Sequence, residues 1–126
     1  MENKLSLILV FFVFMSEYLF AQTIDKTQYK EIDPYDFVIM YNQAIRSSGI
    51  SYNSSYNGKY KSTVIFSFNN GPTYYFVDLE GDTTLFLYAK TRPPRMVEGQ
   101  KVTVYFTFTL DMFGLHDKFL DAVDFL

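Results

Sequence analysis

The sequence predicts a mainly β fold: a small five-stranded barrel preceded by an N-terminal helix or lead-in segment. Short segments after residue 56 alternate between apolar and polar residues, which is the period of a strand with one buried face. Turn-forming residues separate these segments. The chain of 126 residues also carries 14 Phe and 11 Tyr, and aromatic residues favour strands.

Closure of the five strands into a barrel is favoured over an open sheet. Five short strands in an open sheet would leave two exposed edges and a thin core, whereas closure removes the edges. The alternative is another small antiparallel α+β sheet, with a helix over residues 36–45 covering one face.

Residues 1–21 have the features of a signal peptide for export. Lys4 precedes an apolar run at 5–15, and polar residues follow at 16–17. A membrane-spanning helix needs about twenty apolar residues, more than this run supplies. We therefore expect cleavage after Ala21 and a secreted or periplasmic domain with no permanent membrane span. The alternative is an uncleaved membrane anchor.

The composition of the remaining chain limits its class. Removing residues 1–21 leaves ten Lys and Arg against twelve Asp and Glu, so the net charge changes from −3 to −2. About 105 residues suit a single domain. Because the chain has no Cys, it has neither disulfides nor a lipid-anchoring cysteine, and packing must stabilise it. The mild acidity argues against nucleic acid as a partner.

Residues 22–55 are interpreted as an N-terminal helix and loop segment. Four apolar side chains at helical spacing predict a helix over 36–45, with Asp33 in position to cap its first turn. A buried strand over 37–41 is the alternative. The Ser-, Asn- and Gly-rich stretch 46–58 is a loop. The four side chains are Phe37, Met40, Tyr41 and Ala44.

Residues 56–126 contain the five strand candidates of the barrel. In the first, alternate residues up to Phe68 form the apolar face. In the third, Phe86 and Tyr88 lie opposite the core face. The fourth is the cleanest, with Val, Val, Phe and Phe on its core face. The candidates span residues 59–68, 73–79, 83–90, 101–109 and 119–126.

Turns and irregular connections separate the strands. Asn and Gly before Pro72 form the first turn, and residues 80–82 the second. The pair Pro93 and Pro94 rules out central sheet, because each proline removes a backbone donor. Residues 110–118 are interpreted as a connection around a glycine.

Four short motifs resemble the oligonucleotide/oligosaccharide-binding (OB) fold. The most informative is the entry at 99–105, where a glycine and a basic residue lead into a valine-rich strand. The chain is especially similar to exported single-domain members that resemble the anticodon-binding domain of tRNA synthetases. The motifs are Tyr56-Asn57-Gly58-Lys59-Tyr60, Asp78-Leu79-Glu80-Gly81-Asp82, Val97-Glu98-Gly99-Gln100-Lys101-Val102-Thr103-Val104-Tyr105 and Leu120-Asp121-Ala122-Val123-Asp124.

The resemblance implies where a ligand would bind. On this fold, ligands meet the outer face of the second and third strands and the adjoining loops. Aromatic side chains there can stack on bases or sugars, and cations can hold anionic groups. The alternative is that these aromatic side chains cover a core against the N-terminal helix and that the cations only solubilise a loop. The candidate ligand-binding residues are Tyr75, Phe86, Tyr88, Arg92 and Arg95.

We expect no catalytic residue, no metal site and no cofactor. His116 is the only histidine, and Asp111 or Asp117 would have to serve as its partner in acid–base chemistry. If 119–126 is a strand, Asp121 and Asp124 point to opposite faces and form no cation site.

Three functions remain under consideration. The first is an exported binding module of the cell envelope for an unknown ligand, such as a glycan, a peptide or another envelope protein. The second is an envelope structural or accessory protein that acts through a protein–protein interface. The third is nucleic-acid binding, which the charge of the mature chain disfavours.

Overall fold

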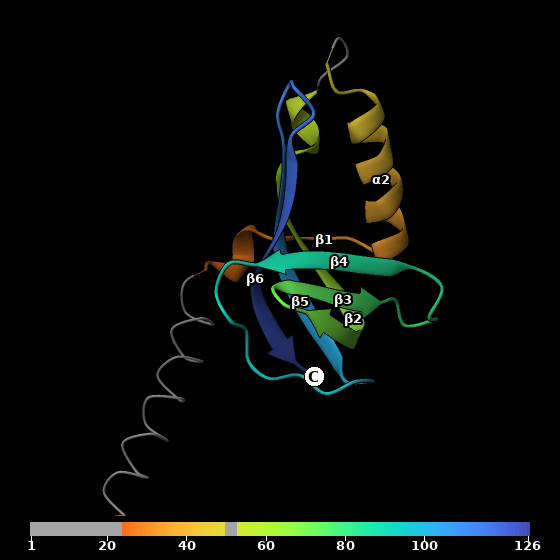
Figure 1. The fold of residues 1–126 in the computed structure, drawn as a ribbon, viewed down its shortest axis with the longest axis vertical. Helices are drawn as coiled ribbons and strands as arrows, with labels where there is room; N and C mark the ends of the chain where they lie inside the picture. Colours follow the sequence, from red (N-terminus) through yellow and green to blue (C-terminus); the bar gives the residue numbers. More distant parts are fainter. Residues whose placement is uncertain (1–23, 50–52) are drawn as a thin grey trace, which may run out of the picture.

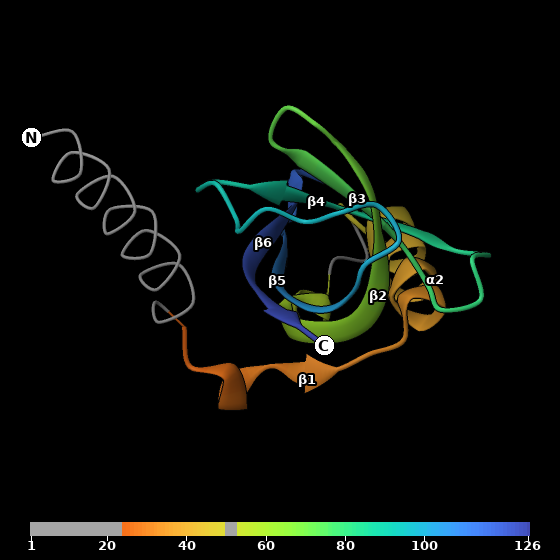
Figure 2. The same ribbon diagram turned by 90° about the horizontal axis from the view of Figure 1, so that it is seen from below.

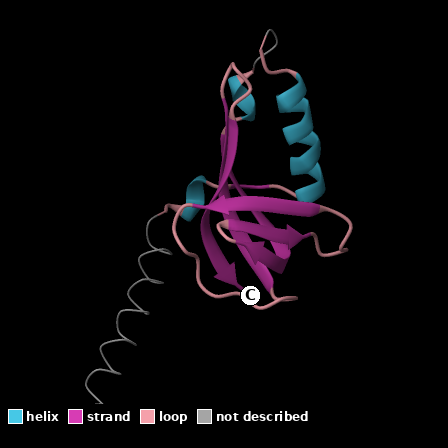
Figure 3. Ribbon diagram, in the orientation of Figure 1, coloured by secondary structure: helices cyan, strands magenta, loops and turns pink. Residues whose placement is uncertain are grey.

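The computed structural model describes residues 24–49 and 53–126 (Figure 1). The predicted signal peptide and its cleavage site lie outside these residues. The described chain is mainly β with one α-helix, which confirms the predicted class (Figure 3). No helix in this part of the chain is long and apolar enough to cross a membrane. The elements are η1 (Lys26–Gln28), β1 (Lys30–Glu31), α2 (Pro34–Arg46), η2 (Ser54–Tyr56), β2 (Gly58–Asn70), β3 (Thr73–Val77), β4 (Thr84–Ala89), β5 (Lys101–Leu110) and β6 (His116–Phe125).

Five of the six strands are joined in a ring of hydrogen bonds. The order in the sheet is β1-β2-β3-β4-β6-β5, and β2 also pairs with β5. Seen from below, the strands wrap around a shared interior (Figure 2). Because β5 returns to lie beside β2 after the consecutive strands β2, β3 and β4, the order is that of a Greek key. β6 completes the ring by pairing parallel with β4 and antiparallel with β5.

β2 is long enough to pair with two different strands. Residues 58–65 pair with β5, and residues 65–70 pair with β3. The register with β3 shifts between Phe66 and Phe68, and a shift of one residue turns the following side chains to the other face. Phe66 is therefore buried, whereas Phe68 is 53% exposed. The expectation that Phe68 lies on the core face is wrong.

The interior of the ring is filled by the side chains that the alternation placed there. The four apolar residues of β5, Val102, Val104, Phe106 and Phe108, have no exposed surface. Leu85 and Leu87 of β4 and Phe76 of β3 join them in the buried core. The predicted alternation is thus confirmed in β4 and for the core face of β5, whereas in β6 it breaks where the adjacent residues Ala122 and Val123 are both buried.

The segment at 36–45 is helical, so the predicted helix is confirmed and the alternative strand over 37–41 is wrong. Asp33 caps α2 by accepting a hydrogen bond from the backbone N–H of Tyr35 at 2.9 Å, as expected. Phe37 is 1% exposed, and its ring centroid lies 4.9 Å from that of Phe106 and 5.8 Å from that of Phe108. The helix therefore packs onto the core and shares it with the strands.

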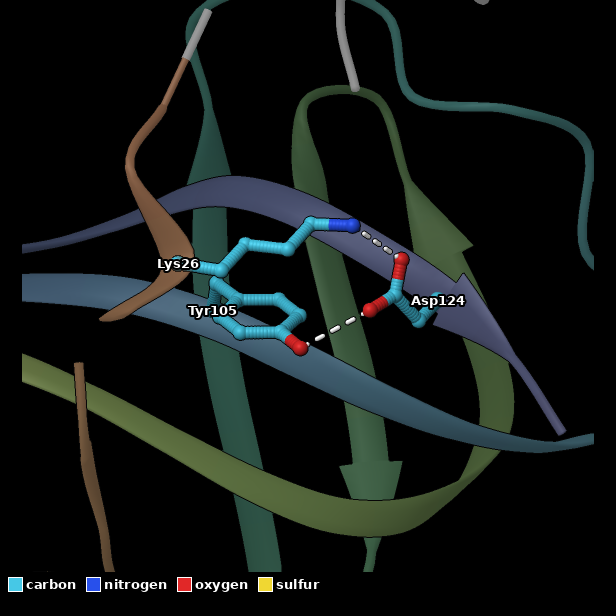
Figure 4. Close-up of polar contacts among 3 residues, drawn as sticks. All are labelled: Lys26, Tyr105 and Asp124. Carbon is cyan, nitrogen blue, oxygen red and sulfur yellow. Dashed lines mark hydrogen bonds and ion pairs between the residues drawn. The ribbon is translucent and has the colours of Figure 1, made fainter. Parts of the chain in front are cut away.

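The N-terminal segment, residues 24–31, packs on the outer face of β5 and β6. Lys26 forms an ion pair with Asp124 at 2.5 Å, and the hydroxyl of Tyr105 donates to the other carboxylate oxygen at 2.8 Å (Figure 4). Tyr29 meets the ring of Tyr105 edge to face, with 5.4 Å between centroids. This cover explains why Tyr105 is only 7% exposed although it points away from the ring interior.

Asp121 and Asp124 lie on the same outer face, contrary to the expectation of opposite faces. The register between β5 and β6 shifts beside Tyr105, which makes Asp121 an additional residue in β6. Asp121 accepts hydrogen bonds from the hydroxyls of Tyr29 at 2.8 Å and Thr107 at 2.5 Å. Within residues 24–49 and 53–126, no cluster of three or more His, Cys, Asp or Glu side chains could hold a metal ion.

The last two strands extend further than expected. β5 runs to Leu110 and β6 begins at His116, so the connection covers residues 111–115 instead of 110–118. Gly114 in this connection has φ +87°, a conformation that favours glycine. His116 and Lys118 consequently belong to a strand, and its alternation places both on the same side of β6.

Candidate ligand-binding groove

Four aromatic side chains lie on the outer face of β2, β3 and β4, and we call them the aromatic face: Phe68, Tyr75, Phe86 and Tyr88. Tyr75 lies opposite Phe86 in the register of the two strands. The rings of Phe68 and Tyr75 are stacked, with 4.4 Å between centroids and 10° between planes. Phe86 is 44% exposed and Tyr88 is 46% exposed, so the face is open to a ligand.

A groove of about 380 Å³, the outer groove, adjoins this face. Tyr75, Phe86 and Tyr88 line it together with Thr73 from the same pair of strands. Helix α2 contributes Tyr41, and β6 contributes residues 116–118. Three of the five ligand-binding residues predicted from the sequence therefore share one groove, with the helix and β6 beside them.

Lys118 is a nearly buried cation in this groove. It is 9% exposed, and its Nζ lies 3.2 Å from the ring centroid of Phe86 and 4.4 Å from that of Tyr41. Both rings present cation–π contacts to the ammonium group. No acidic side chain among the described residues forms an ion pair or hydrogen bond with it. Burial lowers the pKa of Lys118 to about 8, because the charged amine loses hydration.

Tyr41 is held in the groove by His116. The hydroxyl of Tyr41 lies 2.7 Å from Nε2 of His116, and Nδ1 of His116 lies 3.1 Å from the carbonyl oxygen of Gly114. A carbonyl can only accept, so Nδ1 donates to it, and in the tautomer with its proton on Nδ1 the other nitrogen, Nε2, accepts from Tyr41. Burial raises the pKa of Tyr41, which keeps its hydroxyl protonated as that donor. Neither Asp111 nor Asp117 is hydrogen-bonded to His116.

Arg92 and Arg95 do not join the other three predicted site residues. They line a different groove of about 580 Å³, together with Phe66, Tyr74 and Met96. The backbone N–H of Ala89 donates to the carbonyl of Pro72, which ends β4 against the β2–β3 turn. The proline-containing connection then turns away from the aromatic face, with Pro93 and Met96 buried. The predicted site is therefore two separate grooves.

Sequence reasoning missed three residues of this region. The alternation predicts that Phe68 lies in the core, because the bulge beside it leaves no mark in the sequence. Tyr41 was read only as part of a helical face. Lys118 was placed in a connection, although extending the alternation of β6 back to His116 would have put it on the same side as the buried Leu120.

The outer groove combines flat apolar rings, hydroxyl groups and one ammonium group. Its lining is about equally polar and apolar, and aromatic side chains beside placed polar groups are found in ligand sites. The hydroxyls of Thr73, Tyr75 and Tyr88 make no hydrogen bond to another described residue, so each can bond to a ligand. Comparison of the chain with protein-family models, curated proteins and solved structures finds no match.

Proposed function

We propose that this chain is a small exported binding module that holds its ligand in the outer groove, against the aromatic face. The observation that carries the proposal is the set of exposed aromatic side chains beside the buried Lys118. Large exposed apolar patches with polar neighbours mark interaction sites, because leaving them in water is unfavourable.

The strand order supports an OB-like barrel as the scaffold. The ring contains five strands in Greek-key order, as in that fold. Its second and third strands are β3 and β4, whose outer face is where such barrels bind ligands. The position of the outer groove thus agrees with the position that the resemblance implies.

Binding accounts for the groove better than catalysis. Both nitrogens of His116 are engaged, one with Tyr41 and one with the carbonyl of Gly114. A general base needs a nitrogen within reach of the proton that it removes. His116 therefore acts as a support for Tyr41, and we assign the chain no enzymatic activity and no cofactor.

Export rests on the signal at residues 1–21 and is tested directly. The protein collected outside the cytoplasm should begin at or near Gln22 when its N-terminus is sequenced. Recovery of the intact chain from the membrane fraction would support the uncleaved anchor instead.

Aromatic substitutions in the groove test the binding function. Calorimetric titration of the purified protein with a panel of oligosaccharides and peptides identifies a ligand. We expect Tyr88→Ala to weaken its binding about tenfold or more, since a central aromatic contact contributes over about 1–2 kcal/mol. The matched control is Phe125→Ala, because Phe125 is similarly exposed at 45% but lies outside the groove. Equal affinities of all three proteins would contradict the proposal.

A second candidate function is an accessory role through a protein–protein interface. The β5–β6 connection exposes three large apolar side chains: Met112 is 54%, Phe113 83% and Leu115 72% exposed. Light scattering after size-exclusion chromatography over a wide concentration range tests self-association. Oligomers that dissociate on Phe113→Ser substitution would favour this function, and a monomer at all concentrations would exclude association between copies of the chain.

A further inference from the structure

No described residue supplies a hydrogen-bond acceptor to the ammonium group of Lys118, and the side chain is 9% exposed. Its Nζ lies over the rings of Phe86 and Tyr41, and aromatic rings attract the charge but accept hydrogen bonds only weakly. Burying a cation with neither counter-charge nor hydrogen bonds is unfavourable. Because Lys118 also lines the outer groove, a ligand placed there can reach it.

We propose that the outer groove binds an acidic saccharide, with a sugar ring stacked on Phe86 or Tyr88 and its carboxylate accepting hydrogen bonds from Lys118. This inference rests on the proposed binding function and specifies its ligand class. A carboxylate would supply both the counter-charge and the acceptors that Lys118 lacks.

The other polar groups of the groove fit a saccharide. The hydroxyls of Thr73, Tyr75 and Tyr88 can each donate to and accept from sugar hydroxyls. The aromatic face offers flat apolar surfaces to the C–H groups of a sugar ring. All of these groups belong to side chains, so a saccharide could bind here without hydrogen bonds to the backbone.

The same strands are poorly suited to an extended peptide. Peptides commonly bind by adding a strand to an exposed sheet edge. Every residue of β3, from Thr73 to Val77, pairs with β4, and β3 also pairs with β2 on its other side. The backbone of β3 is therefore occupied on both sides, whereas β4 pairs with β6 only through Tyr88 and Ala89. The choice of a saccharide therefore rests on the ring surfaces and hydroxyl groups of the groove, and peptide binding is an outcome of the test below.

The charges around Lys118 allow an anion to bind. Helix α2 contributes Tyr41, β3 and β4 contribute Tyr75 and Tyr88, and β6 contributes His116 and Asp117. Asp117 is the only carboxylate among the groove residues, and it is exposed and forms no ion pair with Lys118. With a pKa of about 8, the amine is mostly protonated at pH 7 and loses its charge as the pH rises above 8.

Titration with matched acidic and neutral sugars tests the inference. The full chain, as isolated, is titrated with oligosaccharides of glucuronate, galacturonate and mannuronate and with their methyl esters, which keep the shape but remove the charge. We expect at least one acid to bind about tenfold tighter than its ester, in line with the strength of a charge-assisted hydrogen bond. This preference should disappear as the pH is raised from 7 to well above 8.

Two lysine variants separate the Lys118 contact from general charge. Lys118→Met should remove the preference for the acid while retaining binding of the ester. Lys90→Met is the matched control, because Lys90 lies 3.9 Å over the ring of Phe119 but outside the outer groove. Far-ultraviolet circular dichroism establishes that both variants are folded. If Lys118→Met does not fold, the inference is tested instead by the unsubstituted protein, whose preference for the acid over the ester should be lost as the pH rises.

Each other outcome has a defined meaning. Equal binding of acids and esters, weakened by Tyr88→Ala, would overturn the acidic ligand and leave the binding function intact. Binding of a peptide or an oligonucleotide in the groove without any saccharide would also overturn it. If neither sugars nor peptides bind, both the inference and the proposed function fail.

Discussion

The side chain of Asn57 extends the pairing between β2 and β5 by one residue. It lies one position before β2 begins at Gly58. Its Oδ1 accepts from the N–H of Leu110 at 2.7 Å, and its Nδ2 donates to the carbonyl of Leu110 at 3.1 Å. The amide thus serves both backbone groups at the end of β5, where the ring gives way to the β5–β6 connection.

Replacement of Asn57 should destabilise the protein measurably. Asn57→Ala removes the two hydrogen bonds between its side chain and the backbone of Leu110, and we expect a loss of about 1–3 kcal/mol in the free energy of unfolding. Asn57→Asp should cost a similar amount, because its carboxylate cannot donate to the carbonyl of Leu110. Urea unfolding measures both, with Asn70→Ala as the control at an exposed strand end. Losses no larger than that of the control would show that the pairing is dispensable.

At the scale of elements, side chains attach the N-terminal segment more than its backbone does. Its strand β1 pairs with β2 through only two residues. Lys26 and Tyr29 connect it to the carboxylates of Asp124 and Asp121 on β6. Partial burial by itself would raise the pKa of Asp124, but the hydrogen bonds from Lys26 and Tyr105 and the charge of Lys26 outweigh it and lower the pKa.

The lowered pKa of Asp124 predicts a loss of stability in acid. The contribution is present above the ordinary aspartate value near 3.8 and disappears as the pH falls through the lower value in the folded protein. Since both partners are about one-third exposed, we expect Asp124→Asn to cost only about 0.5–1 kcal/mol at pH 7 and progressively less as the pH falls below 3.8. Urea unfolding over this pH range measures the difference. A difference independent of pH would contradict it, and Asp117→Asn, on the same strand, is the control.

The sequence predicted the elements well wherever alternation persists. β5 was assigned on its core face because four consecutive alternate positions are large and apolar. Alternation does not predict the two bulges. An inserted residue changes the face on which Phe68 and Asp121 lie without changing the composition around them. The sequence predicts only a polar lead-in segment over residues 24–31. Its attachment to β6 depends on side chains that lie far away in the sequence.

The candidate site was predictable only in part for a related reason. Tyr75, Phe86 and Tyr88 follow from strand alternation combined with the resemblance, and the structure places them in one groove. Lys118 and Tyr41 come from β6 and α2, and their approach to Phe86 depends on how the helix and the last hairpin pack. Nothing local in the sequence specifies that packing.

At the scale of the whole molecule, aromatic packing takes the place of disulfides. The chain has no cysteine, so no cross-link joins helix and strands. Phe37 of α2 instead contacts the rings of Tyr60, Phe106 and Phe108 in the core. Buried tyrosines lie where these parts of the chain pack together: Tyr29 in the N-terminal segment, Tyr60 in β2 and Tyr105 in β5.

This use of tyrosine predicts unfolding in alkali as one event. Burial, together with the hydrogen bond to Asp124 and its negative charge, raises the pKa of Tyr105 to about 12, and burial also raises the pKa values of Tyr29, Tyr41 and Tyr60. The unfolded chain ionises these phenols near pH 10, so the stability they contribute is complete below pH 10 and is lost as the pH rises toward 12.

We expect the absorbance of phenolate to rise in two phases during an alkaline titration. The phase that belongs to the buried tyrosines should coincide with the collapse of the circular dichroism of the strands. Tyr105→Phe removes a phenol that cannot ionise without unfolding, so it should move the collapse to higher pH, although it also leaves Asp124 with one donor fewer. A single phase near pH 10 with unchanged circular dichroism would mean that the tyrosines do not hold the N-terminal segment, the helix and the strands together.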